Sequence, residues 1–242
     1  MVLCDIKDDR KVEPMKILLV ADQESRYIWD FFDPKRFENI DVILSAGDLK
    51  ASYMEFINTV LRKPLYYVHG NHDQRYIDTP PMGCISIEDN LVVVNGIRIL
   101  GLGGSMRYKR GPMQYSEAEM AKRVRKLRRK IEKHKGFDIL LTHAPAKGLG
   151  DGDDLCHQGF MVFNQLLDTY KPSYFLHGHQ HLNYNINAKR VRHYDQTTII
   201  NGYDYYIFDF EPNGYTYDKK NGPKPDVNPH LWIKKIFLQK KQ

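Results

Sequence analysis

The stretch Tyr67-Val68-His69-Gly70-Asn71-His72-Asp73 decides how the rest of the chain is interpreted. The apolar residues 65–68 predict a buried strand, which ends at a glycine followed by an amide, an imidazole and a carboxylate. These three side chains can bind a cation or transfer a proton. A buried strand that ends in such a cluster predicts a functional site.

The same layout recurs at four other apolar runs. Residues 16–20, 41–45, 138–142 and 173–176 each lead to polar side chains, which are Asp22, Glu24, Asp48, His143, His179 and His181. Continuous rather than alternating apolarity predicts strands buried on both faces. Because open α/β sheets bind ligands at the carboxyl ends of their strands, we expect these side chains to converge.

Helical patterns fall between these strands. Residues 51–61, 116–135 and 160–170 are predicted helices, the long one opened by a capping box of Ser116 and Glu119. Asn95-Gly96 predicts a hairpin of residues 91–94 and 97–100. Further strands are expected at 184–187, 191–194, 197–201 and 205–210 as a meander, and at 231–238. We therefore predict one α/β domain of stacked sheets flanked by helices over residues 15–210, an N-terminal extension at 1–14 and a C-terminal tail at 211–242.

Composition narrows the class of protein. The 242 residues carry a net charge of +6, which fits attraction to phosphate-bearing substrates or nucleic acid. The three cysteines, Cys4, Cys84 and Cys156, are too far apart for a thiolate zinc motif, and their odd number speaks against a disulfide framework. The N-terminus carries no secretory pattern, so a cytoplasmic location is expected. No apolar run approaches the ~18 residues of a membrane span, and no membrane partner is expected.

The candidate ligands are nitrogen and oxygen donors without sulfur. His179 and His181 are two residues apart, so in extended chain both point the same way. Such donors suit Mn, Fe, Zn or related divalent ions better than a soft metal. They are too many for one tetrahedral ion. A pair of ions about 3.5–4 Å apart, bridged by one carboxylate, would use them all.

These residues carry a family resemblance. The motifs resemble, in order, the five blocks of the calcineurin-like metallophosphoesterases, and they are Asp22-x-Glu24, Gly47-Asp48, Gly70-Asn71-His72-Asp73, Thr142-His143 and Gly178-His179-Gln180-His181. The resemblance covers about residues 15–210, and the segment from Thr142 to Phe160 is similar to small prokaryotic phosphohydrolases of this group. It implies a four-layer α-β-β-α sandwich of two mixed sheets flanked by helices.

The resemblance also implies a role for each residue. Two divalent ions (Mn, Fe, Zn or Ni) would be bridged by Asp48, with Asp22 and His181 completing one site and Asn71, His143 and His179 the other. His72 would face the scissile phosphate of a small phosphate monoester or diester, which a metal-activated hydroxide attacks. Asp73 or a backbone carbonyl would orient His72.

One residue departs from the family pattern, because Glu24 stands where the family has histidine. Glu24 could replace the imidazole as a ligand and favour a harder ion such as Mn or Fe(II). It could instead lie behind the ligands and leave the first ion weakly held. A third alternative is a degraded site in a one-metal protein or a non-catalytic scaffold, as in the related retromer subunit. We favour the first alternative, because the other motif residues are intact.

Three further features leave alternatives open. His157, in a loop rich in glycine and aspartate, is either a substrate contact or an exposed loop histidine. Residues 122–130 are strongly basic and read most simply as a solvated helix face, although they could guide nucleic acid in a nuclease. Ser105, Arg107 and Tyr108 could line the substrate pocket. Substrate, native metal and oligomeric state are not determined by the sequence.

Overall fold

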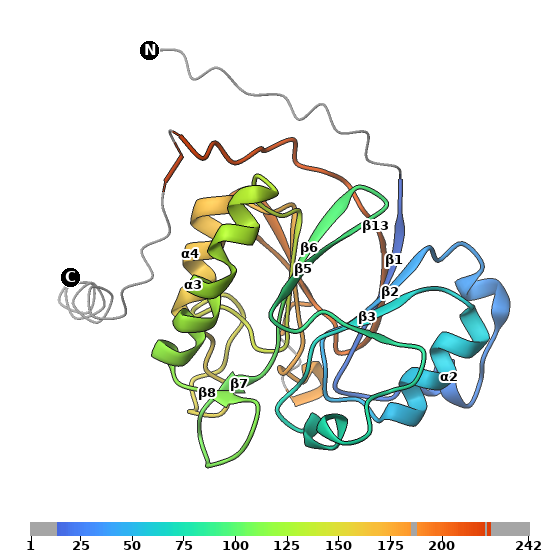
Figure 1. Ribbon diagram of the computed structural model, residues 1–242. Coiled ribbons are helices and arrows are strands. Elements are labelled where there is room, and N and C mark those ends of the chain that lie inside the picture. The colour runs from blue at the N-terminus through green and yellow to red at the C-terminus, as the bar shows by residue number, and fades with distance from the viewer. Residues whose placement is uncertain (1–13, 185–187, 221, 224–242) are drawn as a thin grey trace.

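A computed structural model describes residues 14–184, 188–220 and 222–223. Two sheets lie face to face, and helices cover the outer face of each (Figure 1). The order of layers is therefore helix, sheet, sheet, helix, as the resemblance implied.

The first sheet contains the strands that precede three of the sequence motifs. Its order is β13 (Asp204–Asp209), β1 (Lys16–Ala21), β2 (Val42–Ser45), β3 (Leu65–Tyr67) and β4 (Ile85–Ser86). Strands β1 to β4 are mutually parallel, and β13 pairs antiparallel with β1. The ends of β1, β2 and β3 therefore meet at one edge of the sheet.

The second sheet contains the other two motif strands. Its order is β11 (Val191–Tyr194), β12 (Thr197–Asn201), β10 (Tyr174–His177), β9 (Ile139–Thr142), β6 (Ile97–Leu102) and β5 (Asn90–Val94). The four central strands are parallel, and the two edge strands are antiparallel to their neighbours. A small separate ladder joins β7 (Ser105–Met106) to β8 (Gln114–Tyr115).

Three apolar layers hold these elements together. Alternation along β1 sends Ile17 and Leu19 into the layer between the sheets, and Leu18 and Val20 outward against α2 (Ala51–Leu61). The short helix α1 (Arg26–Trp29) covers the same outer face. On the far side, α3 (Glu117–Lys133) and α4 (Met161–Tyr170) pack on the second sheet. All motif strands are therefore buried on both faces.

Most predicted elements are present. The five motif strands and the hairpin β5–β6 are confirmed, and α2 spans the predicted 51–61. The capping box of α3 is confirmed, because the Ser116 side chain accepts from the Glu119 N–H while Glu119 accepts from the Ser116 N–H. Short 3-10 helices span Pro34–Phe37, Asp73–Ile77 and Leu182–Tyr184.

The predicted C-terminal meander is wrong. β11 and β12 form a hairpin in the second sheet, but β13 crosses to the first sheet and pairs with β1 in the register Lys16↔Asp209. Tyr184 lies in a 3-10 helix instead of a strand, while residues 185–187 and 231–238 lie outside the described residues. Strand periodicity does not say which sheet a strand joins.

No helix among the described residues is long and apolar enough to cross a membrane. Beyond β13, Tyr217 packs its ring against Tyr170 of α4 at 4.7 Å between centroids and is buried. The chain thus still contributes to the core after residue 210.

Candidate metal centre

The predicted ligands lie at the carboxyl ends of five strands, at one edge of the sandwich. Asp22 follows β1, Asp48 follows β2 and Asn71 follows β3, while His143 and His179 follow β9 and β10 of the other sheet. The strand ends of both sheets open at the bottom of Figure 1. A site at this edge therefore needs both sheets.

Three of these residues adopt a left-handed backbone conformation that non-glycine residues rarely take. The φ angles are 64° at Asp22, 59° at Asp48 and 66° at His179. Such conformations cost of order 1 kcal/mol or more and persist where the surroundings enforce them. The side chains of all three residues line the same pocket at this edge.

Two glycines let the second and third motif loops touch. A Cβ on Gly47 would lie 2.2 Å from the Gly70 nitrogen, and one on Gly70 would lie 1.9 Å from Asp48 Oδ1. Gly47 has a φ of +93°, which favours glycine. The φ of Gly70 is not in the left-handed region, so Gly70 is needed because the two loops approach each other closely.

Asp73 ties the same two loops together. Its Oδ2 accepts hydrogen bonds from the Gly70 N–H at 2.7 Å and the Asp48 N–H at 2.8 Å. Burial and the neighbouring Asp48 charge raise the pKa of Asp73 to about 6. The resemblance implied that either Asp73 or a backbone carbonyl orients the His72 ring. The hydrogen bonds of Asp73 in the described part of the chain go to these backbone N–H groups instead.

Electron-pair donors from three strand ends face one another at the centre. His143 Nε2 lies 2.9 Å from Asn71 Oδ1 and 3.3 Å from Asp48 Oδ2. Asn71 turns its Nδ2 toward the Tyr108 hydroxyl, which assigns Oδ1 to the His143 side. Adjacent ligands of an octahedral ion at ~2.1 Å stand about 3 Å apart. The spacing therefore fits a divalent cation.

Backbone carbonyls select the ligating nitrogen of both histidines. His143 Nδ1 is 2.8 Å from the Ala46 carbonyl, and His179 Nε2 is 2.6 Å from the Cys156 carbonyl. A carbonyl accepts only, so each of these nitrogens carries the proton. The lone pairs are then at His143 Nε2 and His179 Nδ1. Ligand atoms of Asp48, His143 and His179 all lie within 4.8 Å of one another.

The charges at this centre show what a cation would replace. Burial opposes the charged form of His143, but the adjacent Asp48 carboxylate outweighs it and raises the pKa of His143 to about 9. Burial likewise opposes the charge of Asp48, but His143 reverses the effect and lowers the pKa of Asp48. His179 has a lowered pKa because it is buried beside His143. A proton on His143 thus supplies the positive charge that a bound cation would otherwise provide at this centre.

The residues predicted for the first ion lie beside this cluster. Both carboxylate oxygens of Asp22 accept from the His179 N–H, at 3.0 and 2.9 Å, and burial raises the pKa of Asp22 to about 7. His181 packs its ring beside Tyr203, 5.1 Å between centroids, and lines the same pocket as Asp22 and Asp48. Asp22 and His181 therefore border the cluster of Asp48, His143 and His179.

Glu24 is held by a partner that sequence reasoning missed. Its Oε1 forms an ion pair with Lys50 Nζ at 3.0 Å, and Lys50 follows Asp48 by two residues. The Glu24 side chain lines a hollow shared with Asp22, Asp48 and His72. Glu24 therefore lies beside Asp22 and Asp48, but its carboxylate is already paired with the Lys50 ammonium group.

A pocket of about 380 Å³ opens above the candidate ligands. His72 is exposed at its mouth, and its backbone N–H donates to Asp48 Oδ1 at 2.7 Å. Tyr108, from the loop between β7 and β8, and His157 also line it. The His157 ring is 5.4 Å from His179 and 2.8 Å from Asp154, so the structure brings this loop histidine to the site.

Of the contacts that sequence reasoning missed, only one had a sequence signal. The Ala46 and Cys156 carbonyls are backbone groups, which carry no side-chain signature. Lys50, by contrast, is a cation two residues after Asp48, facing the atypical Glu24, and its charge could have marked it.

A family model, that of the calcineurin-like phosphoesterases, matches residues 15–183. The chain belongs to this family. The sequence resemblance is thereby confirmed, and with it the expectation of a metal-binding phosphoesterase fold. A search of curated proteins found no match.

Solved structures share the phosphoesterase fold at low sequence identity. One crystal structure aligns with a TM-score of 0.60 and 14% identity, covering 81% of this chain and 95% of that chain. The protein TT1561 of Thermus thermophilus aligns with a TM-score of 0.55 and 16% identity, covering 79% of this chain and 90% of that chain. At these identities the likeness concerns the fold alone.

Proposed function

We propose that this protein is a metal-dependent phosphohydrolase that cleaves a phosphate monoester or diester at a centre of two divalent ions. The observation that carries the proposal is the convergence of His143 Nε2 with Asn71 Oδ1 at 2.9 Å and with Asp48 Oδ2 at 3.3 Å. Without a cation or proton between them these lone pairs repel. Membership of the calcineurin-like phosphoesterases supports the reaction class.

The donor set suggests how two ions are held. Asn71, His143 and His179 would hold one, Asp22, Glu24 and His181 the other, and Asp48 would bridge them. When bound, the ions polarise the phosphate oxygens and lower the pKa of water to near neutrality. Nitrogen and carboxylate donors suit Mn, Fe, Zn or Ni.

The chain's own residues would position the ester and move the proton. His72 stands at the mouth of the pocket, and its bond from the backbone N–H to Asp48 fixes it beside the bridging carboxylate. From there its ring would protonate the leaving oxygen. The buried carboxylate of Asp73 keeps the Asp48 and Asn71 loops in register through Gly70.

The test is hydrolysis of p-nitrophenyl phosphate and bis(p-nitrophenyl) phosphate with Mn, Fe(II), Ni or Zn added to metal-free protein. Asp48→Asn and His72→Ala should each lower kcat by at least about a hundredfold. The control is Glu38→Gln, an exposed carboxylate outside the site. Full activity in either site variant contradicts the mechanism.

The Glu24–Lys50 ion pair keeps one alternative open for this experiment. If Glu24 stays paired with Lys50, it is not a ligand, and the ion assigned to Asp22 and His181 is weakly held. A protein that holds both ions and still hydrolyses no ester would be a scaffold. Metal content by plasma emission separates the two outcomes, because an inactive protein that holds two ions per chain favours the scaffold.

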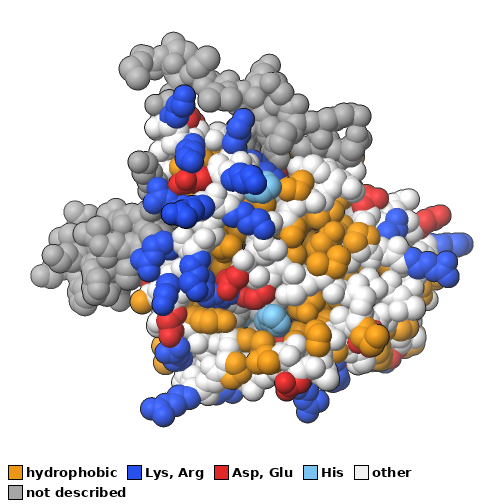
Figure 2. Space-filling model, in the orientation of Figure 1, with side chains coloured by type: hydrophobic (Ala, Val, Ile, Leu, Met, Phe, Trp, Pro, Cys, Tyr) orange, Lys and Arg blue, Asp and Glu red, His pale blue; other side chains and the backbone are white. Residues whose placement is uncertain are grey.

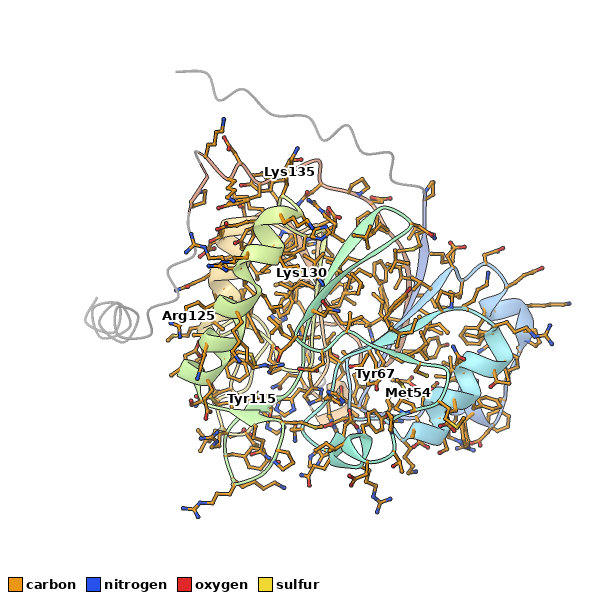
Figure 3. The ribbon with its side chains drawn as sticks, in the orientation of Figure 1. Met54, Tyr67, Tyr115, Arg125, Lys130 and Lys135 are labelled. Carbon is orange, nitrogen blue, oxygen red and sulfur yellow. The ribbon has the colours of Figure 1, made fainter. Side chains whose placement is uncertain are left out.

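A nuclease is the second candidate, and α3 supplies the observation. Arg123 is buried and paired with Glu88 and Asp89, so the basic run is only partly available. The exposed members without an ion pair among the described residues are Lys122, Arg125, Lys126 and Arg129. Cationic side chains gather over this helix in Figure 2, and Arg125 points away from the sheet in Figure 3. Oligonucleotide binding with a steep salt dependence would favour this candidate.

The two described cysteines that are free, Cys84 and Cys156, fit the proposal of a reducing cytoplasmic location.

A further inference from the structure

A second pocket lies beside the candidate metal centre. It has a volume of about 460 Å³ and is lined by the 150–157 loop, the end of β10 and strand β11. His157 and His181 line both this pocket and the one above the candidate ligands. The two pockets therefore adjoin each other at these two histidines.

Cationic side chains on one wall of this pocket have no acidic partner among the described residues. The side chains of Lys189 and Arg192 form no ion pair or hydrogen bond within the described ranges 14–184, 188–220 and 222–223. Arg190 is fixed instead by backbone groups, because its Nη1 donates to the carbonyls of Asn201 at 3.1 Å and Tyr203 at 2.8 Å. The charge of Arg190 is thus held in place by backbone carbonyls, with no salt bridge to it in the part of the chain that the structure describes.

The acidic residues on the opposite wall are mostly engaged. Asp151 accepts from the backbone N–H groups of Gly148 and Gly159 and pairs with Lys147 at 3.0 Å. Asp154 bonds the His157 ring at 2.8 Å. Only Asp153 lines the pocket without a charged partner in the described chain. Lys189 and Arg192 are therefore cations that the pocket's carboxylates leave unpaired in the described chain.

A buried acceptor also faces this space. His177 is 2% exposed, and its Nδ1 donates to the Gly178 carbonyl at 2.9 Å, which leaves the lone pair on Nε2. A Cβ placed on Gly150 would lie 3.9 Å from this Nε2 and 3.3 Å from Arg192 Nε. No hydrogen bond to Nε2 exists among the described residues. The imidazole and the guanidinium thus border the same volume beneath the loop.

We infer that this second pocket binds the leaving group of the substrate, and that this leaving group is an alcohol carrying a second phosphate. Arg192 and Lys189 would bind the second phosphate, for which the planar guanidinium offers paired N–H donors. His177 Nε2 would accept a hydrogen bond from a hydroxyl of the same group. The favoured substrates are thus polyol or sugar phosphates with two phosphate groups. This inference rests on the proposed phosphohydrolase function.

The test compares a substrate with one phosphate and a substrate with two. We expect the wild-type enzyme, loaded with Mn, to show a higher kcat/KM for fructose 1,6-bisphosphate than for p-nitrophenyl phosphate, measured as phosphate released. Arg192→Met should lower kcat/KM for the bisphosphate by about tenfold to a hundredfold, the value of one charge-assisted contact. It should leave p-nitrophenyl phosphate unchanged.

Two further variants keep the result interpretable. Lys189→Ala changes an exposed side chain and should lower only the bisphosphate rate, which guards against misfolding of the Arg192 variant. Arg129→Met, on the exposed face of α3, removes the same charge elsewhere and should change neither rate. Equal losses on both substrates, or no loss on the bisphosphate, overturn the inference.

Binding to metal-free protein separates this inference from the proposed function. In the presence of a chelator, fructose 1,6-bisphosphate should still bind wild-type protein by calorimetry, and Arg192→Met should weaken that binding about tenfold or more. If neither substrate is hydrolysed but this binding difference holds, the function fails and the pocket stands. If the bisphosphate does not bind, or binds both proteins equally, the pocket assignment is wrong.

Discussion

Replacing Asp73 tests whether its paired hydrogen bonds hold the metal-binding loops in place. In Asp73→Ala, the N–H groups of Gly70 and Asp48 lose their common acceptor, Oδ2, in a side chain that is 4% exposed in the wild type. An unsatisfied buried N–H costs roughly 1–3 kcal/mol. Two of them should therefore lower the free energy of unfolding by about 2–5 kcal/mol.

Asp73→Asn separates the hydrogen bonds from the charge. Both bonds go to one oxygen, so an amide oxygen in that place can accept both N–H groups. The amide also removes a carboxylate whose pKa burial and Asp48 raise, which is a sign that the ionised form is disfavoured. We therefore expect Asp73→Asn to change stability by less than about 1 kcal/mol.

Urea unfolding of metal-free protein, followed by circular dichroism at pH 7, measures both variants. Asp78→Ala, an exposed aspartate five residues later, is the control and should stay within about 0.5 kcal/mol of wild type. If Asp73→Ala is as stable as Asp73→Asn, the two N–H groups find other partners and the reasoning is refuted.

The remaining predictions concern metal binding and pH. Saturating Mn, at about a hundred times its Kd, should raise Tm by about 5–10 °C, and Asp48→Asn should show no such rise in differential scanning fluorimetry. Asp48 raises the pKa of His143 to about 9, and the ion must displace the proton that His143 therefore holds. Calorimetry should accordingly find Mn affinity rising with pH up to that value; a flat profile contradicts the pairing. Lys50→Met should raise the affinity for the more weakly held ion by up to about fivefold, because the largely exposed Lys50–Glu24 pair is worth ~1 kcal/mol at most. Glu24→Ala should lower that affinity. If neither change affects the metal stoichiometry, Glu24 is not a ligand. Glu88→Gln should cost about 3 kcal/mol at pH 7, because Glu88 joins Arg123 to the His69 loop. The pKa of Glu88 is lowered, since His69 and Arg123 outweigh burial, so the stabilisation is present above the ordinary value of 4.5 and is lost as pH falls through the folded-state pKa. The gap between wild type and variant in urea should accordingly shrink in acid.

Continuous apolar runs predicted the motif strands because strands buried on both faces leave a strong local signal. The same logic placed Asp48 and His143 at one edge, although they belong to different sheets. The sequence could not assign β13 to the first sheet, because the pairing of Lys16 with Asp209 depends on contacts far apart in the chain. Local pattern thus predicted the elements better than their partners.

The candidate site was predictable in its side chains but not in their supports. Motif spacing named Asn71, whereas the orientation of His179 depends on a carbonyl at Cys156, in a loop of unrelated sequence. The Glu24–Lys50 pair was likewise hidden, because an ion pair across two loops has no fixed spacing. Supports of this kind arise from tertiary packing.

The division of the ligands between two sheets has a consequence for how the protein folds. The bond between Asp22 and His179 joins residues 157 positions apart, and His143 contacts Ala46 across the sandwich. Contacts of such long range form late, because the chain entropy of closing large loops is lost before they stabilise anything. A chain emerging from the ribosome therefore cannot assemble this centre until residue 181 has been made. The rate of metal binding during refolding should accordingly equal the rate at which the two sheets dock, which is the last step of folding.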